Sequence, residues 1–206
     1  RIRARQGKQA AVSAGERAAV ESHIHSRPQH PRPRSDWDLL ARFRERAIGL
    51  ASTVDMADSL GSVPAAAARY LKSNSLPLTA ACWAEFSTLD WRSAGIEIAA
   101  RPALDADQVG ITGAFCAIAE TGTLVTVTGT QTPAVTSLLP ETHIAVVAVS
   151  RIVRGMEEAW QLARDELGQL PRAVNFISGP SRTADIEQTV TLGAHGPYRV
   201  HVILVA

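Results

Sequence analysis

The chain has 206 residues, of which 46% are hydrophobic and 20% charged, and its formal net charge is +1. These values are typical of a soluble globular protein with room for one ordinary α/β domain. Only two cysteines, Cys82 and Cys116, are present. This number excludes a disulfide framework, a four-cysteine zinc site and an iron–sulfur cluster held by this chain alone. No apolar run reaches about 18 residues and no hydrophobic segment follows Arg1–Arg5, so we expect no membrane span, no secretory signal and a cytoplasmic protein.

Positive charge is concentrated at the start of the chain. Residues 1–50 contain 11 basic and 5 acidic residues, whereas the remainder contains 10 and 15. The stretch ending in His30-Pro-Arg-Pro-Arg34 lacks apolar periodicity, so we expect a basic arm over residues 1–34 and a single α/β domain over 35–206. Such an arm can bind nucleic acid or an acidic partner. Because it has no interleaved aromatic residues and no nucleic-acid module, we favour a solvated or partner-docked arm and expect no nucleic-acid partner.

The first half of the domain shows helix caps and short apolar strands. Asp36 precedes apolar residues at helical spacing, so we expect it to cap a helix that ends at Gly49. A second helix is predicted from Val63 to Lys72, because its first turn holds a proline and its next residues are alanines. Strands are predicted at Leu78–Cys82 and Ile96–Ala99.

The second half is richer in strands. The alternating or continuous aliphatic runs predict strands at 115–119, 124–128, 144–149, 173–177 and 198–205. Ser150 precedes an apolar stripe from Ile152 to Leu167, which predicts a helix capped by Ser150 and ended by Gly168. This order of elements predicts an α/β fold with three layers (α/β/α) and a mostly parallel sheet.

Three polar segments lie at the ends of predicted strands, where open parallel sheets commonly bind ligands. The first is Ala119-Glu-Thr-Gly-Thr-Leu124. Gly122 allows a tight turn, and the hydroxyls of Thr121 and Thr123 flank the carboxylate of Glu120. This turn can hold an anionic substrate with Glu120 as base, nucleophile or hydrogen-bond acceptor, or it is a simple hairpin with a solvated glutamate.

The second segment is Ser178-Gly-Pro-Ser-Arg-Thr-Ala-Asp-Ile-Glu187, directly after a strand. Gly179 permits close approach of the backbone, and Arg182 supplies a planar cation suited to a carboxylate or phosphate. We predict a ligand-binding role for Gly179, Ser181, Arg182, Thr183 and Asp185. The alternative is that the serine and aspartate only cap backbone groups while Arg182 pairs with Asp185.

The third segment is Leu192-Gly-Ala-His-Gly-Pro197, before the last predicted strand. His195 lies between glycines and can act near neutral pH as acid, base or donor, so it joins Glu120 as a candidate catalytic residue. His201, within an apolar strand, is interpreted as structural. We expect no metal site: His23, His25 and His30 lack companion ligands, although Asp185, Glu187 and His195 could meet in space.

Five segments form a pattern in order and spacing: Gly110-Ile-Thr112, Ala119-Glu-Thr-Gly-Thr123, Ser137-Leu-Leu-Pro140, the stretch 178–187 and Gly193-Ala-His-Gly-Pro197. They resemble motifs of the LUD-domain family and, more narrowly, of its lactate-utilization members. The resemblance covers about residues 105–206 and implies a fold like that of the ribose-phosphate-isomerase and CoA-transferase group. It also implies a role in bacterial L-lactate oxidation to pyruvate, with no cofactor in this chain and iron–sulfur clusters on partner proteins.

The first functional hypothesis is therefore a non-redox subunit or accessory of a lactate-oxidising system that binds a small carboxylate or a phosphorylated ligand. The second is a free-standing enzyme of the CoA-transferase or sugar-phosphate-isomerase type, in which Glu120 forms a covalent intermediate. The third is a pure interaction module whose motifs serve only the fold. The oligomeric state is not predicted.

Overall fold

The computed structural model describes residues 2–9, 11–29, 31–32, 34–184 and 189–206. The chain forms two compact units, Arg1–Arg34 and Ser35–Ala206. The first contains α1 (Ile2–Arg5) and α2 (Ala14–Ser26). Helix α2 begins with a capping box, since Ser13 Oγ accepts from the Glu16 backbone N–H and the Glu16 carboxylate accepts from Ser13 N–H. Among the described residues, no helix combines the length and apolar character that crossing a bilayer requires.

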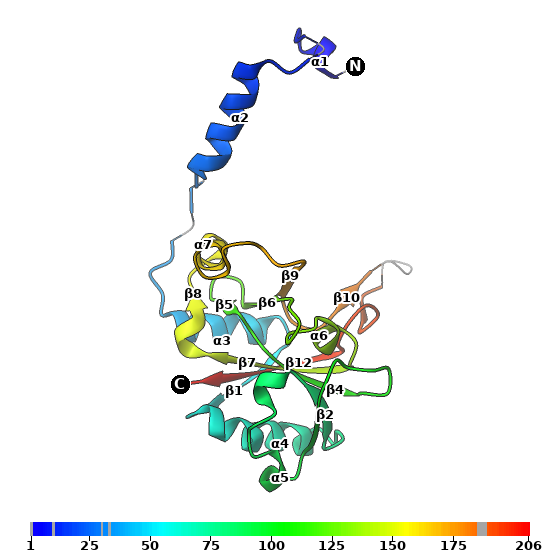
Figure 1. The fold of residues 1–206 in the computed structure, drawn as a ribbon. Coiled ribbons are helices and arrows are strands. Elements are labelled where there is room, and N and C mark those ends of the chain that lie inside the picture. Colours follow the sequence, from blue (N-terminus) through cyan, green and yellow to red (C-terminus); the bar gives the residue numbers. More distant parts are fainter. Residues whose placement is uncertain (1, 10, 30, 33, 185–188) are drawn as a thin grey trace. The chain divides into compact units, whose positions relative to one another are not determined.

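The second unit is built on a six-stranded sheet in the order β1-β12-β7-β4-β2-β3, with every neighbouring pair parallel. The prediction of a mostly parallel sheet is therefore confirmed (Figure 1). The central strands β7 and β12 are almost entirely buried, and five of the seven residues in each are aliphatic. The six strands are β1 (Thr53–Ala57), β2 (Thr79–Cys82), β3 (Glu97–Ala100), β4 (Val109–Gly113), β7 (Thr142–Ala148) and β12 (Arg199–Val205).

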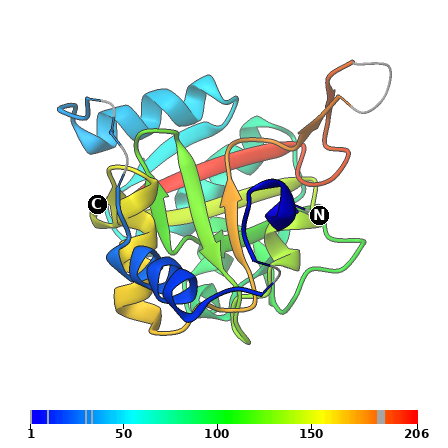
Figure 2. The ribbon, with the colours of Figure 1, turned by 90° about the horizontal axis from the view of Figure 1, so that it is seen from above.

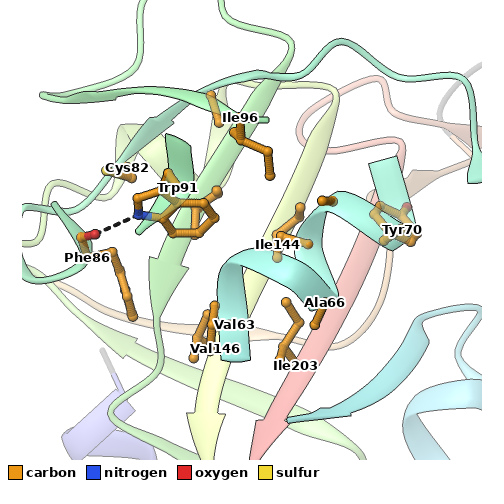
Figure 3. Close-up of a cluster of buried hydrophobic side chains, with 14 of the residues drawn as sticks. Val63, Ala66, Tyr70, Cys82, Phe86, Trp91, Ile96, Ile144, Val146 and Ile203 are labelled. Carbon is orange, nitrogen blue, oxygen red and sulfur yellow. Dashed lines mark hydrogen bonds between the residues drawn. The ribbon is translucent and has the colours of Figure 1, made fainter. Parts of the chain in front are cut away.

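One face of this sheet is covered by α4 (Val63–Ser73) and α5 (Trp91–Ala94), which share a buried cluster with the strands. Figure 3 shows this cluster around Ile144 at the centre of the sheet. Trp91 is buried, and its indole Nε1 donates to the carbonyl of Phe86 at 2.7 Å. That bond satisfies the one polar atom that the tryptophan side chain takes into the core.

The opposite face is covered by α3 (Leu39–Gly49) and by a second, four-stranded sheet. Helix α7 (Met156–Leu167) packs on the outer side of that sheet. The strands of the second sheet run across those of the main sheet, as Figure 2 shows. Its order is β8-β5-β6-β9, comprising β8 (Ile152–Val153), β5 (Cys116–Ile118), β6 (Thr123–Val127) and β9 (Val174–Ile177).

Short elements complete the unit. A small antiparallel hairpin, β10 and β11, and the single-turn helix α6 lie in the stretches that lead toward β12 and β7. Three 3₁₀ turns follow strands β1, β2 and β7. The bounds are η1 (Leu60–Ser62), η2 (Ala84–Phe86), η3 (Val149–Arg151), α6 (Val135–Leu138), β10 (Arg182–Thr183) and β11 (Thr191–Leu192).

Two predicted helix starts are wrong. Helix α3 begins later than expected, because the carboxylate of Asp38 rather than Asp36 accepts from Ala41 N–H at 2.8 Å. Ser150 caps no helix: the next residues form β8, which pairs with β5, and α7 begins only after Gly155. Strand pairing with β5 thus overrides the helical spacing of the apolar stripe. Strands β1 and β4 are additions that the sequence pattern does not predict.

Two histidines are buried in the central strands. His143 Nε2 lies 2.7 Å from Thr112 Oγ1, and this hydroxyl donates its own hydrogen to the carbonyl of Gly113. His143 Nε2 must therefore be the donor to Thr112. The buried Nδ1 of His143 has no hydrogen-bond partner among the described residues. His201 stacks on Tyr70 with ring centroids 3.9 Å apart and bonds to Thr53 Oγ1. Burial lowers the pKa of each imidazole to about 4. The interpretation of His201 as structural agrees with this environment.

We predict that stability falls as the pH drops from 6.5 toward 4. The unfolded chain binds protons at its histidines in this range, whereas the folded chain does not, so each buried histidine costs about 2 kcal/mol between pH 7 and pH 5. His201→Phe retains the stack on Tyr70 and removes one titrating group. Urea unfolding at pH 7 and pH 5 should show that the free energy of unfolding falls by about 2 kcal/mol less in this variant than in the parent. The exposed His25→Phe serves as control, and equal pH dependence of H201F and parent contradicts the assignment.

Candidate functional site

The first polar segment forms the turn of the β5–β6 hairpin and packs against α3. Gly122 has a φ of +70°, and a Cβ there would lie 2.5 Å from Ala47 N and 2.6 Å from Arg46 C. Its N–H donates to the carbonyl of Ile118 at 2.9 Å. Glycine is therefore required both by the backbone conformation and by the close approach to the helix.

A chain of three hydroxyls joins the first segment to the second. Thr121 Oγ1 lies 2.8 Å from Thr123 Oγ1, which lies 2.7 Å from Ser178 Oγ. Thr123 is buried, and the antiparallel pairing of β6 with β9 places it opposite Ser178. The two threonines predicted to position a ligand thus also fasten two strands of the second sheet together.

Glu120 lies next to this chain of hydroxyls, at the end of β5. Its backbone N–H donates to the carbonyl of Arg154 at 3.0 Å, which fixes the residue against the segment that leads into α7. The side chain is partly buried, and within the described part of the chain its carboxylate makes no hydrogen bond or ion pair. Among the described residues, the Glu120 carboxylate is therefore not committed to a structural hydrogen bond or ion pair.

The second segment packs on the C-terminal end of α3. Gly179 has a φ of +79°, and a Cβ there would collide with the carbonyl oxygen of Leu50. Arg182 Nη2 donates to that same carbonyl at 2.8 Å. The two groups predicted to bind an anion therefore also hold their loop against the helix, although Arg182 is exposed and this contact uses one of its five N–H donors.

The second and third segments form one structural piece. Strand β10 pairs with β11, so Thr183 lies opposite Thr191. Ser181 N–H donates to the carbonyl of Pro197, and the Ser181 carbonyl accepts from Gly193 N–H, both at 2.9 Å. Side-chain hydroxyls thus join the first segment to the second, and backbone hydrogen bonds join the second to the third. Asp185 and Glu187, like His30 in the first unit, lie outside the described residues.

His195 lines a pocket of about 680 Å³ at the amino ends of β7 and β12, which we call the amino-edge pocket. The side chain of Arg199 enters it, with Nη1 3.9 Å from Glu141 Oε2 and the guanidinium 5.0 Å from the Tyr198 ring centre. Apolar atoms of Leu138, Leu139 and Leu192 form other parts of the wall. The pocket therefore combines a permanent cation, an imidazole ring and an apolar surface.

The predicted residues divide between two places. The amino-edge pocket is lined by His195, but neither Glu120 nor Arg182 lines it. Glu120 belongs to the hydroxyl-lined turn, and the described contacts of Arg182 lead to α3. Within residues 2–184 and 189–206, apart from the gaps stated above, no group of three or more histidine, cysteine or acidic side chains is arranged to hold a metal ion.

Sequence reasoning missed Arg199 and Glu141. Arg199 is the first residue of a mostly apolar strand, and that pattern gives no signal for a functional role of its side chain. Glu141 directly follows the Ser137–Pro140 segment of the family resemblance. A second missed feature is a pocket of about 470 Å³ at the carboxyl ends of the main strands, lined among others by Asp58, Glu85 and Arg151. The only sequence signal for it is the position of Glu85 shortly after a predicted strand.

Comparison with known proteins identifies relatives for the larger unit. Residues 75–205 match the family model described as LUD domain. Lactate utilization protein C of Exiguobacterium sp. is 40% identical over 142 residues, which are 67% of this chain and 61% of that protein. The protein of the same name from Bacillus subtilis is 40% identical over 101 residues, 48% of this chain and 42% of that one. The chain thus spans between 42% and 61% of the length of these two relatives.

A solved structure shares the fold. The crystal structure of a DUF162 family protein from Deinococcus radiodurans superposes with a TM-score of 0.64, covering 84% of this chain and 100% of that chain at 24% identity. The likeness supports the α/β architecture with its mostly parallel central sheet.

The close packing of the hairpin turn on α3 predicts an unusually costly glycine substitution. Gly122→Ala should destabilise the domain through its left-handed backbone and through collision with the helix backbone. Gly168→Ala is the matched control, because Gly168 has a φ of +65° and a Cβ added there would have no neighbour within 4 Å. Urea unfolding should show that G122A loses at least about 1 kcal/mol more than G168A. Equal losses would mean that the turn does not depend on this contact.

Proposed function

Because this chain belongs to the LUD domain family, we propose that it serves bacterial lactate utilization as a non-redox subunit or accessory that binds a small carboxylate. Relatives named lactate utilization protein C support the process, and their greater length makes the activity and partners of the whole protein part of the proposal. The electron-transfer centres are proposed to be iron–sulfur clusters on partner proteins. Burial raises the pKa of both thiols, Cys82 and Cys116, to about 11, so neither is a ready thiolate ligand.

The amino-edge pocket carries the ligand-binding part of this proposal. Arg199 is paired only loosely there, since Glu141 lies 3.9 Å away and its side chain is 75% exposed. An ion pair of this kind contributes little to stability, so a ligand carboxylate can displace Glu141 at small cost. A guanidinium binds a carboxylate through two parallel hydrogen bonds, and His195 lies on the same wall as a donor or proton-transfer group.

Part of the second predicted segment is joined to the segment that lines this pocket. Ser181 is hydrogen-bonded to both ends of the segment that holds His195, and Arg182 and Thr183 continue from it into the hairpin. In the proposed function Gly179 and Gly122 set the position of these loops through their contacts with α3. A phosphorylated ligand is the alternative occupant, since Arg199 suits phosphate as well as carboxylate.

Binding of small anions tests the proposal. Titration calorimetry with L-lactate, pyruvate and ribose 5-phosphate should detect binding of at least one of them to the parent chain. Arg199→Met should weaken that binding at least about tenfold because the cation is lost while the aliphatic stem is kept. Arg172→Met, at an exposed site elsewhere, should leave it unchanged. No binding by the parent, or equal affinity of R199M, contradicts the proposal.

Arg182→Ala, measured beside these variants, separates two roles of that residue. Loss of its bond to Leu50 should lower the melting temperature. A weaker affinity in the same variant would assign Arg182 to the ligand as predicted from the sequence, whereas an unchanged affinity would assign it to loop docking alone.

The unpaired carboxylate of Glu120 favours a second candidate, a CoA-transferase-like enzyme. In that function the carboxylate attacks the acyl carbonyl of an acyl-CoA, the C–S bond breaks and CoA leaves as the thiolate. Incubation with acetyl-CoA followed by intact-mass measurement decides between the two. The lactate-utilization proposal predicts no adduct, whereas a mass increase that disappears in Glu120→Gln would favour the transferase.

A further inference from the structure

The pocket of about 470 Å³ at the carboxyl ends of the main sheet is separate from the proposed carboxylate site. We call it the carboxyl-edge pocket. Residues at or directly after the carboxyl ends of β1, β4, β7 and β12 line it, together with Glu85 and Phe86 of η2, the 3₁₀ turn that follows β2. Its volume lies within the range of about 300–1,000 Å³ that small-molecule sites occupy.

The chain changes faces beside this pocket. After β2 the chain passes through η2 to α5, on the face that α4 also covers. After β4, the neighbour of β2 in the sheet, it passes to β5 on the opposite face (Figure 1). The ends of β2 and β4 therefore separate and leave a crevice between them. In open α/β sheets such a point of divergence is where ligands bind.

Glu85, in η2, lies in this crevice over the end of β4. A Cβ on Gly113 would collide with Glu85 Oε1, yet Gly113 does not have a positive φ. Glycine at position 113 therefore leaves space for the Glu85 carboxylate; the backbone conformation does not require it. Below it, Thr112 Oγ1 donates to the Gly113 carbonyl and accepts from the buried His143, which fixes the strand end.

The charges of this pocket favour a ligand without negative charge. Across the described residues, neither Glu85 nor Asp58 makes a hydrogen bond or ion pair. Glu85 is exposed by surface area, but desolvation of its carboxyl by neighbouring protein atoms raises the pKa of that group. Among the described residues that line the pocket, the cation is Arg151, which is committed elsewhere: its Nη atoms bind Glu166 at 2.6 and 2.9 Å and its Nε donates to the Phe115 carbonyl. Two carboxylates are therefore left to face the ligand.

The wall also has an apolar part, formed by Phe86 and by the ends of the central strands at Val146, Val147 and Val205. Figure 3 shows Phe86 and Val146 extending from neighbouring elements toward one region of the core. We propose that the carboxyl-edge pocket binds an uncharged, hydroxyl-bearing ring compound of the nucleoside type, with Glu85 and Asp58 accepting hydrogen bonds from its sugar hydroxyls. Carboxylates accept two hydroxyl hydrogen bonds readily, and the apolar wall suits the face of the ring.

Amide chemical shifts of the ¹⁵N-labelled full chain, titrated with adenosine, test this inference. Adenosine should give saturable shifts at Gly113, Ala114 and Phe86 with a Kd tighter than about 10 mM. Glu85→Gln should weaken binding about tenfold or more, whereas the matched control Glu141→Gln, at the other edge, should not. Adenosine 5′-monophosphate should bind this edge more weakly than adenosine because its phosphate meets the two carboxylates.

A second variant keeps the test decisive if the first one alters the fold. Gly113→Ala adds a methyl group where the Glu85 carboxylate lies and should reduce adenosine affinity to a similar extent, with the remaining amide shifts unchanged. Absence of saturable shifts at this edge, or parent-like affinity of both variants, overturns the inference. L-Lactate in the same sample should shift amides at Arg199 and Gly196 and leave those at the carboxyl-edge pocket unchanged. The two site proposals are therefore tested independently of each other.

Discussion

The close packing of two glycine turns on α3 is the constraint on which the rest of the domain depends. Gly122 contacts the backbone near Ala47, and Gly179 contacts the carbonyl of Leu50, where Arg182 also donates its hydrogen bond. The Thr123–Ser178 hydroxyl bond joins the two turns to each other. Together these contacts lock the second sheet to the helix that covers the main sheet. They also fix the start of the β10–β11 hairpin, which leads into the segment that contains His195.

The two edges of the main sheet have opposite chemical character. At the amino edge, Arg199 and His195 share a pocket in which Glu141 lies 3.9 Å from Arg199 and is 75% exposed. At the carboxyl edge, Asp58 and Glu85 share a pocket in which the arginine is already neutralised by Glu166. A carboxylate is therefore favoured at one edge and disfavoured at the other. The two proposed sites therefore differ in the charge of the ligand that they favour.

Much of the scaffold follows from the sequence where burial dominates. Ile144–Val149 is aliphatic throughout and Tyr198–Val205 is aliphatic at five of its eight positions, so these runs predict the two central strands correctly. Thr53–Ala57 mixes polar and apolar residues over five positions and carries no comparable signal; it forms an edge strand that pairs with β12. Ile152 and Val153 fit a helical stripe equally well, and only their pairing with β5 decides that they form a strand. That pairing is a tertiary contact that local spacing does not contain.

The site is less accessible to prediction. The three polar segments are identifiable from the sequence, and the hydrogen bonds of Thr123 and Ser181 join them. The sequence does not reveal that Gly179 and Arg182 contact α3, since that contact joins positions 132 residues apart. It also does not single out Glu85, an isolated acid in a stretch without clear periodicity. The most direct measurement of the central claim is a crystal structure with bound pyruvate. It should show the ligand carboxylate against the Arg199 guanidinium with Glu141 turned away, whereas a ligand bound only at the carboxyl edge would contradict the account.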